Sequence, residues 1–146
     1  MSGGLLAGAY PGARSAVEHH ERAGVTLFVD LTHPSDPLPD YGQWLGTARR
    51  IAHPIPDMRA PTAGHMMRIL DDIDSGRRDG DVVYVHCWGG VGRTGTVIGC
   101  WLTRHGLDDG DSIARIAELR AGSGDPRPSP ETAAQADLVR GWRRGW

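Results

Sequence analysis

The sequence of 146 residues contains no lysine, and all 16 of its basic side chains are arginines. Any basic side chain that contacts a phosphate group must therefore be an arginine. With 18 acidic residues the formal net charge is −2, which does not favour a general affinity for nucleic acid or for anionic lipid. We therefore expect neither a nucleic acid nor a membrane among the partners.

Cysteine is also scarce, since the chain has only Cys87 and Cys100. Two cysteines do not make a disulfide framework. No apolar run approaches the length that spans a bilayer, and Met1 is not followed by a secretory signal segment. These absences predict a cytoplasmic protein, in which a free thiol stays reduced and available for catalysis. The length predicts a single domain over residues 1–146.

Apolar runs typical of strands alternate with helical patterns along the chain. Buried strands are expected over residues 25–31 and 81–86, and a shorter strand over residues 50–55. This alternation predicts an α/β domain with a mainly parallel central sheet, covered by helices on both faces. The expected helices run from a capping box at Ser15 and Glu18 to Gly24, from Thr62 to Gly76, from Thr94 to His105, from Asp111 or Ser112 to Arg120, and onward from Ser129 and Pro130.

The stretch Val82–Gly95, VVYVHCWGGVGRTG, is consistent with two different chemistries. Its Gly-x-Gly-x-x-Gly at 90–95 has the spacing of a dinucleotide-binding turn. That motif needs an acidic residue at the end of a second strand, whereas Asp108, Asp109 and Asp111 fall in a polar turn between two expected helices. A Walker phosphate loop needs a lysine, which the chain lacks. A nucleotide-binding protein is therefore the less favoured alternative.

The second chemistry uses Cys87, which is expected at the end of a buried strand and before a glycine-rich turn. The backbone N–H groups of residues 88–93 can converge there on a dianionic group and lower the pKa of the thiol from about 8.5 to about 3.5–7.5. Arg93 can hold two phosphate oxygens at once, and the Thr94 hydroxyl can aid departure of the sulfur. The expected phosphate-binding residues are Trp88, Gly89, Gly90, Val91, Gly92 and Arg93.

The run His86–Gly95, HCWGGVGRTG, resembles the H-C-x-x-G-x-G-R-[S/T]-G loop of the cysteine-dependent protein tyrosine phosphatases. The chain length and the late position of the loop are similar to those of small dual-specificity-like phosphatases, notably compact bacterial ones. The resemblance implies a dual-specificity-phosphatase-like fold and metal-independent hydrolysis of phosphomonoesters through a phosphocysteine, with no cofactor. It also implies that His86 orients the loop by hydrogen bonding and does not transfer the proton.

The resemblance further implies an aspartic acid upstream of the nucleophile, which protonates the leaving oxygen and then acts as base. Asp57 fits because it follows an expected strand and a proline, while Asp30 and Asp40 stay open as competitors. A glutamine that holds the attacking water is implied at Gln135. Arg127 lies in a loop that can reach the pocket, but we do not count it as a site residue.

The implied substrate is a phosphoprotein or phosphopeptide. Phosphotyrosine is the favoured phosphorylated residue, and phosphoserine and phosphothreonine are alternatives. The tyrosine-specific branch has a recognition loop with a lysine and an Asn-Arg-Tyr run, which this chain lacks. Trp88, Gly89 and Val91 stand where lipid-directed relatives often carry lysine, which disfavours a phosphoinositide. We also expect the loop to bind phosphate, vanadate or sulfate, and we favour a monomer.

An alternative of a different class is a pseudophosphatase, which binds phosphate without turning it over. Its usual mark is loss of the nucleophile, the arginine or the acid. Residues matching all three are present in this sequence, so we expect an enzyme.

Overall fold

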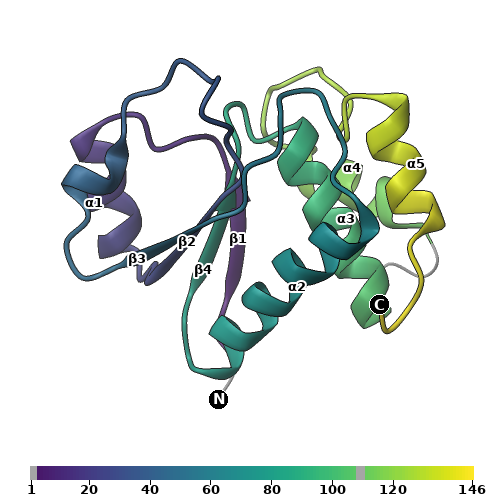
Figure 1. The fold of residues 1–146 in the computed structure, drawn as a ribbon, viewed down its shortest axis with the longest axis horizontal. Coiled ribbons are helices and arrows are strands. Elements are labelled where there is room, and N and C mark those ends of the chain that lie inside the picture. Colours follow the sequence, from purple (N-terminus) through teal and green to yellow (C-terminus); the bar gives the residue numbers. More distant parts are fainter. Residues whose placement is uncertain (1–2, 108–110) are drawn as a thin grey trace.

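The computed structural model describes residues 3–107 and 111–146. Within them, one parallel sheet has the strand order β1-β4-β2-β3 (Figure 1). The strands are β1 (Leu5–Gly8), β2 (Leu27–Asp30), β3 (Arg49–Ala52) and β4 (Val83–His86). All residues of the two central strands are buried, as the continuous apolar runs predicted. The edge strand β1 was not predicted, because its four residues have no clear alternation.

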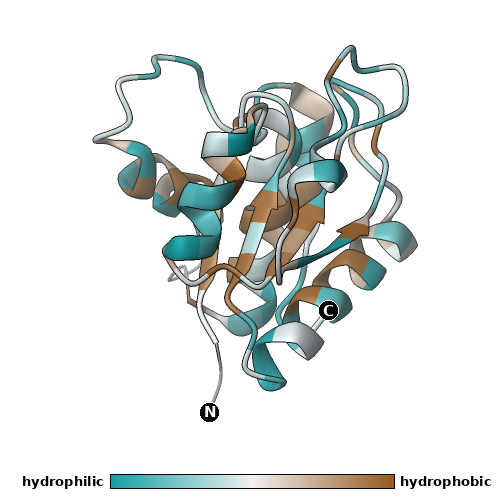
Figure 2. Cartoon of the chain, turned by 90° about the vertical axis from the view of Figure 1, so that its left-hand side faces the viewer, coloured by the Kyte–Doolittle hydropathy of each residue, from teal (hydrophilic) through white to brown (hydrophobic). Residues whose placement is uncertain are grey.

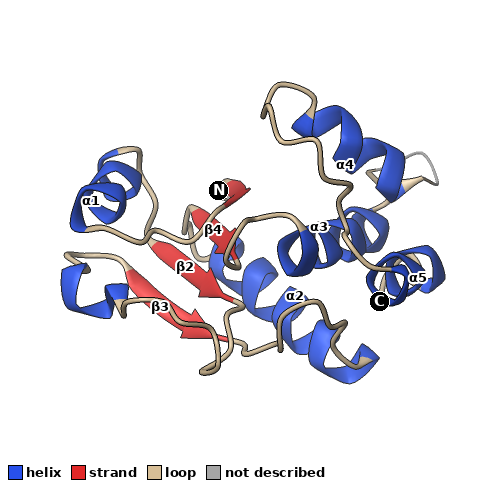
Figure 3. Ribbon diagram, turned by 90° about the horizontal axis from the view of Figure 1, so that it is seen from above, coloured by secondary structure: helices blue, strands red, loops and turns tan. Residues whose placement is uncertain are grey.

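Helices cover both faces of this sheet, which confirms the expected α/β architecture. In the described chain they are α1 (Arg14–Arg22), the 3-10 helix η1 (Tyr41–Trp44), α2 (Ala63–Arg78), α3 (Gly92–His105), α4 (Ser112–Arg120) and α5 (Ala133–Gly141). Helix α1 and η1 lie on one side of the sheet, and the other helices lie on the opposite side (Figure 3). Helices α4 and α5 pack against α3, which is therefore central, as its nearly all-round apolar surface predicted.

The core divides into two apolar clusters because successive strand residues point to opposite faces. In β2, Leu27 and Val29 pack toward the cluster under α2 and α3, and Phe28 packs toward the cluster under α1. In β4, Val85 packs in the cluster under α2 and α3, and Tyr84 packs in the cluster under α1. Figure 2 shows the resulting concentration of hydrophobic residues along the strands. This sheet holds the end of β4, where the cysteine follows, between two packed layers.

Several predicted helix ends are confirmed by their capping contacts. The Thr62 side chain accepts a hydrogen bond from the His65 N–H at the start of α2. The Asp111 side chain accepts one from the Ala114 N–H at the start of α4. Helix α3 ends at Gly106, whose φ of 64° is left-handed. Asp108 and Asp109 lie outside the described residues.

Other predicted ends were wrong. Helix α2 continues through Gly76, where the glycine serves close packing and does not end the helix: an added Cβ would lie 2.7 Å from Leu27 Cδ2. The left-handed residue after this helix is Gly80, with a φ of 93°. Ser15 lies inside α1, whose N-cap Ala13 has no side-chain cap, so the expected capping box does not form.

Two further helix starts differ from the prediction. Helix α3 begins at Gly92, two residues before Thr94. The last helix begins three residues after Pro130, because the capping residue is Thr132 and not Ser129. No helix in the described ranges is long and apolar enough to cross a membrane.

Candidate active site

The site is built on the loop of residues 87–93, which joins β4 to α3. Cys87 follows the strand directly and its residue surface is only 3% exposed. Gly90 has a φ of 75°, and a Cβ there would lie 2.5 Å from the Gly8 carbonyl carbon, so only glycine fits where the loop crosses the end of β1. The strand, the tight loop and the helix therefore follow one another as the sequence predicted.

The loop offers backbone donors to a ligand. In the described part of the chain, none of the N–H groups of residues 88–93 donates a hydrogen bond to a backbone carbonyl outside the helices or to a side chain. These amides stand at the N-terminus of α3, where the helix dipole adds a partial positive charge. Free amides at such a helix end favour an anion.

Arg93 lies in the first turn of α3 and its guanidinium is 1% exposed. Its Nη1 donates to a carboxylate oxygen of Asp36 at 2.7 Å and to the Ile55 carbonyl at 2.8 Å. Its Nε and Nη2 are buried without a hydrogen-bond partner. Two donors that lack a hydrogen-bond partner, on one edge of a planar guanidinium, match two oxygens of a phosphate group. An anion bound there would complete the hydrogen bonds of this buried side chain.

Asp36 is a site residue that the sequence analysis missed. Its side chain is 5% exposed and also accepts a hydrogen bond from the His33 N–H. Burial by itself would raise the pKa of Asp36, but the hydrogen bonds from Arg93 and His33 outweigh burial and hold that pKa below its usual value. An ionised Asp36 therefore anchors Arg93 through Nη1 and leaves Nε and Nη2 without a hydrogen bond, with Nη2 in an ion pair with Asp57. Nothing in the local sequence around Asp36 signals this contact.

We expect the substitution Asp36→Asn to lower kcat/KM for p-nitrophenyl phosphate by about 10- to 100-fold, because Arg93 then donates to a neutral amide oxygen in place of a carboxylate. The inhibition constant of vanadate should rise in parallel, since both anions depend on the orientation of Arg93. The matched control is Asp40→Asn in the same loop, where the carboxylate is 71% exposed. Equal activity of both variants and the wild type would contradict the anchoring role.

Asp57, the predicted acid, lies beside Arg93. One carboxylate oxygen is 3.2 Å from Arg93 Nη2 and accepts a hydrogen bond from the Met58 N–H at 2.9 Å. The side chain is 51% exposed, so it stands at the solvent side of the site. Met58 has a left-handed φ of 66°, a strained conformation for a residue with a side chain, and such strain is common at functional sites.

The two competing aspartates have other partners. Asp30 is buried at the end of β2, where its carboxylate accepts hydrogen bonds from the amide and hydroxyl of Thr32. Asp40 caps η1 and forms an ion pair with Arg50. Of the three candidates, Asp57 is the one that the structure brings to Arg93.

His86 is fully buried behind the loop. Its Nε2 lies 2.7 Å from the Tyr41 hydroxyl and its Nδ1 lies 3.3 Å from the Cys87 carbonyl oxygen. A neutral imidazole satisfies both contacts if Nδ1–H donates to the carbonyl and Nε2 accepts from Tyr41. Burial lowers the pKa of His86 to about 4, so the ring is neutral near pH 7. This arrangement suits the expected orienting role.

The lowered pKa of His86 predicts that acid destabilises the fold. In the unfolded chain a histidine gains its proton below about pH 6.5, whereas buried His86 does so only near pH 4. The unfolded state therefore binds more protons between these values, and the unfolding free energy falls by about 3 kcal/mol as the pH drops from 6.5 to 4. Chemical denaturation at several pH values measures this.

The control for this prediction is the variant His86→Gln. Burial also lowers the pKa values of His20 and His65, and both residues are retained in the variant. The difference between the two curves therefore isolates His86. Parallel curves for wild type and variant between pH 6.5 and 4 would contradict the prediction.

Thr94 follows Arg93 in the first turn of α3. Its hydroxyl oxygen is buried and has no hydrogen-bond partner. A buried hydroxyl whose hydrogen has no acceptor can donate a hydrogen bond to a ligand or to a nearby sulfur atom. Its expected role with the departing thiolate stays a prediction.

Gln135 is fully buried, so the alternative of an exposed helical glutamine was wrong. Its Oε1 accepts hydrogen bonds from the Glu131 and Thr132 N–H groups, which closes the capping box of α5. Its Nε2 donates to the carbonyl of Arg59, two residues beyond Asp57. The amide therefore joins α5 to the segment that carries the acid, and a role in holding water stays a prediction.

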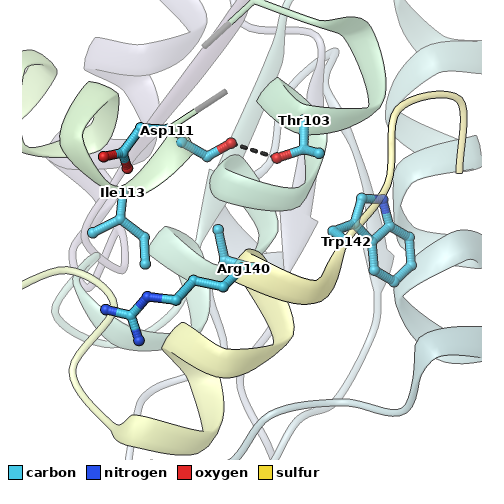
Figure 4. A pocket seen from close by; sticks show the side chains of 7 residues that line it. Thr103, Asp111, Ile113, Arg140 and Trp142 are labelled. Atoms are coloured by element: carbon cyan, nitrogen blue, oxygen red, sulfur yellow. Dashed lines mark hydrogen bonds between the residues drawn. The ribbon is translucent and has the colours of Figure 1, made fainter. Parts of the chain in front are cut away.

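Two other features lie away from this loop. Cys100 is fully buried, and burial raises the pKa of its thiol to about 12, which makes it unreactive. A hollow of about 280 Å³ lies between α3, α4 and α5, where Ile113, Arg140 and Trp142 line it (Figure 4). Its residue Thr103 is ten positions along α3 from Arg93, roughly 15 Å away along the axis. Among the described residues, no cluster of three or more His, Cys, Asp or Glu is placed to hold a metal ion.

Comparison with known proteins gives one family match. A family model described as "PTP-SAK: Swiss Army Knife protein, DSP-PTPase phosphatase domain" matches residues 2–141. Over 69 residues the chain is 36% identical to the dual specificity protein phosphatase CDC14B of Mus musculus. That segment is 47% of this chain and 14% of the relative, so the likeness concerns a small part of the longer protein.

Solved structures show the same fold. Tk-PTP in the active form is similar with a TM-score of 0.78 and 26% identity, over 94% of this chain and 90% of that chain. TpbA of P. aeruginosa in complex with pTyr is similar with a TM-score of 0.72 and 23% identity, over 94% of this chain and 79% of that chain. These likenesses confirm the expected dual-specificity-phosphatase-like fold.

Proposed function

The chain belongs to the family of dual-specificity-type protein tyrosine phosphatase domains, and on this premise we propose that it hydrolyses phosphomonoesters through a phosphocysteine, without metal or cofactor. The observation that carries the proposal is Arg93, whose buried guanidinium has two nitrogens without a hydrogen-bond partner, one of them 3.2 Å from Asp57, beside the loop that begins at Cys87. We take residues 1–146 as one phosphatase domain. We also propose that the protein is a monomer of the cytoplasm, where its two free cysteines stay reduced.

In the first step the Cys87 thiolate attacks phosphorus, so that a sulfur–phosphorus bond forms and the phosphorus–oxygen bond to the leaving group breaks. Asp57 gives its proton to the leaving oxygen. Arg93 and the loop amides hold the remaining phosphate oxygens, whose charge is spread in the transition state. The exposed position of Asp57 beside Arg93 supports this assignment, because a leaving group departs toward solvent.

In the second step water attacks the phosphocysteine, and the carboxylate of Asp57 takes its proton. The sulfur–phosphorus bond breaks, and the Thr94 hydroxyl stabilises the departing thiolate. We propose that Gln135 orients the water. Its hydrogen bond to the Arg59 carbonyl supports a place near the acid, since Arg59 is in the same segment.

We propose protein phosphotyrosine as the leading substrate, with phosphoserine and phosphothreonine as further candidates. Two apolar side chains stand exposed on segments that flank the site: Trp88 is 46% exposed and Met58 is 51% exposed. Exposed apolar side chains beside a phosphate site suit an aromatic ester. The complex of TpbA with pTyr, a relative in fold, is consistent with this choice.

The test is turnover of p-nitrophenyl phosphate by reduced wild-type protein in excess EDTA. We expect turnover that orthovanadate inhibits competitively, because vanadate occupies the place of the transferred phosphate. A folded protein that binds vanadate without turning over the ester would instead be a phosphate-binding module. A protein that binds neither would contradict the proposal altogether.

A further inference from the structure

Residues 54–62 link β3 to α2 and carry Asp57, so we call them the acid-carrying segment. Two of its backbone carbonyls also contact the site. The Ile55 carbonyl accepts from Arg93 Nη1 at 2.8 Å, and the Arg59 carbonyl accepts from a buried side-chain amide of α5 at 3.1 Å. The place of Asp57 therefore depends on how this segment is held at its two ends.

Two histidines that the reaction described above does not use meet at these ends. His53 directly precedes the segment, and His65 lies in the first turn of α2. His53 Nδ1 lies 3.3 Å from His65 Nε2, and the ring centroids are 5.3 Å apart. On its other side, His53 Nε2 lies 2.6 Å from a carboxylate oxygen of Asp72, two turns further along α2. The His53 N–H donates to the Asp30 carbonyl at 2.8 Å, and its side chain is 12% exposed, so this ring is well fixed.

The contact between the two rings requires a single hydrogen between the facing nitrogens. If His53 Nε2–H donates to Asp72, then Nδ1 of the neutral ring accepts from His65 Nε2–H. One added proton can enter at Nδ1 of His65 and leave this hydrogen in place. When both rings are protonated, both facing nitrogens carry a hydrogen and two like charges face each other, so the contact breaks.

Two charged groups of α2 face these rings. The Asp72 carboxylate contacts His53, and Arg68 acts on His65. From β2 the Asp30 carbonyl contacts His53, whereas the Asp30 carboxylate accepts hydrogen bonds within its own loop. Burial, His53 and Arg68 lower the pKa of His65, and the first turn of a helix disfavours a cation further. His65 is therefore neutral near pH 7, which keeps the two rings in contact.

We propose that His53 and His65 are positioning residues, which hold the two ends of the acid-carrying segment together and thereby keep Asp57 beside Arg93. The inference rests on the proposed function, because it takes Asp57 as the acid. The two histidines are twelve positions apart along the chain, and their contact closes this span into a loop. Without the contact the two ends can separate, and Asp57 spends less time within reach of the leaving oxygen.

The test compares two substitutions of the same residue. His65→Ala removes the partner ring, whereas His65→Gln supplies an amide N–H that can donate to His53 Nδ1 without a charge. We expect His65→Ala to lower kcat for phenyl phosphate about 3- to 10-fold, and for p-nitrophenyl phosphate less, because the poorer leaving group depends more on the acid. KM and the inhibition constant of vanadate should stay nearly unchanged. His65→Gln should match the wild-type rates.

A pH profile separates positioning from a merely structural role. Near pH 7 the wild type and His65→Gln should have equal kcat for phenyl phosphate. As the pH falls toward about 5, both rings of the wild type gain protons, and its kcat should fall about 3- to 10-fold below that of the variant. Both proteins retain His86, so its own titration cancels. The matched control is His105→Ala, which removes a histidine paired with Asp74 in the C-terminal half of α2 and should leave the ratio of the two ester rates unchanged.

A second measurement does not depend on turnover. Trypsin cleaves after arginine, and Arg59 is exposed in the acid-carrying segment. We expect cleavage after Arg59, located by the masses of the products, to be about 3- to 10-fold faster in His65→Ala than in the wild type, because local opening becomes easier. In His65→Gln the cleavage rate should equal that of the wild type.

Failure of the inference is separable from failure of the proposed function. An unchanged ratio of ester rates in His65→Ala, or an equal loss in His65→Ala and His65→Gln, would overturn the positioning role while turnover itself stands. If the wild type turns over neither ester, the proposed function fails and the cleavage rates decide. Equal cleavage of the three proteins would then overturn the inference, and faster cleavage of His65→Ala alone would support it.

Discussion

Replacing Cys87 by serine is expected to reduce turnover of p-nitrophenyl phosphate by more than about 10⁴-fold. A hydroxyl is far less acidic than a thiol, and the field of free amides at the start of α3 cannot make it an alkoxide at neutral pH. Initial rates in excess EDTA, measured at saturating ester, check the loss. Activity of the variant within tenfold of the wild type would exclude a phosphocysteine.

The same variant should keep its affinity for anions, because serine leaves the amides and Arg93 in place. A rise in Tm with added phosphate, equal to that of the wild type, measures this. The matched control is Cys100→Ala, which removes the other thiol from the core. Cys100 lies on the buried side of α3, within the core, and its thiol is unreactive, so this variant should retain full activity and lose some stability.

The second large effect is expected for Asp57→Asn, which should lower kcat by about 10² to 10⁴-fold. Asparagine keeps an oxygen that can accept from the Met58 N–H, but it has no proton to give to the leaving oxygen. The loss should therefore be greater for phenyl phosphate than for p-nitrophenyl phosphate, whose leaving group needs less protonation. Measured kcat values for both esters test this difference.

The control for Asp57→Asn is Asp40→Asn, which changes a carboxylate that pairs with Arg50 and not with Arg93. It should affect both esters little and equally. If Asp57→Asn lowers both rates by the same factor, or raises only KM, then Asp57 contributes charge or binding and another group supplies the proton.

Much of the site could be predicted from the sequence because it is contiguous. The loop of residues 87–93 needs a buried strand before it, glycines within it and a helix after it, and all three signals lie within a few residues of Cys87. Cap residues such as Thr62 and Asp111 could be predicted for the same reason, since the side chain of each accepts a hydrogen bond from the backbone N–H three residues later. The expectation for Asp57 came from a family resemblance and a strand end, and the structure places this residue beside Arg93.

What the sequence could not predict depends on segments that are distant along the chain. Asp36 meets Arg93 across 57 positions, and Arg127 meets Gly89 across the whole of α3 and α4. No local pattern marks either contact, because both follow from the order of strands in the sheet and from the packing of α4 on α3. The glycine at position 76, inside α2, has the same kind of origin, since its place is set by the close approach of Leu27 from β2.

The sequence by itself therefore determined the chemistry at the end of β4: a thiol, a run of amides and an arginine at the start of a helix. Only the tertiary structure decided how that arginine is held and what lies around it. Asp36 and the Ile55 carbonyl accept hydrogen bonds from one nitrogen of Arg93, and the other two nitrogens have no hydrogen-bond partner. The physical reason is that covalent spacing sets contacts within a loop, whereas contacts between loops are set by how the helices pack on the sheet.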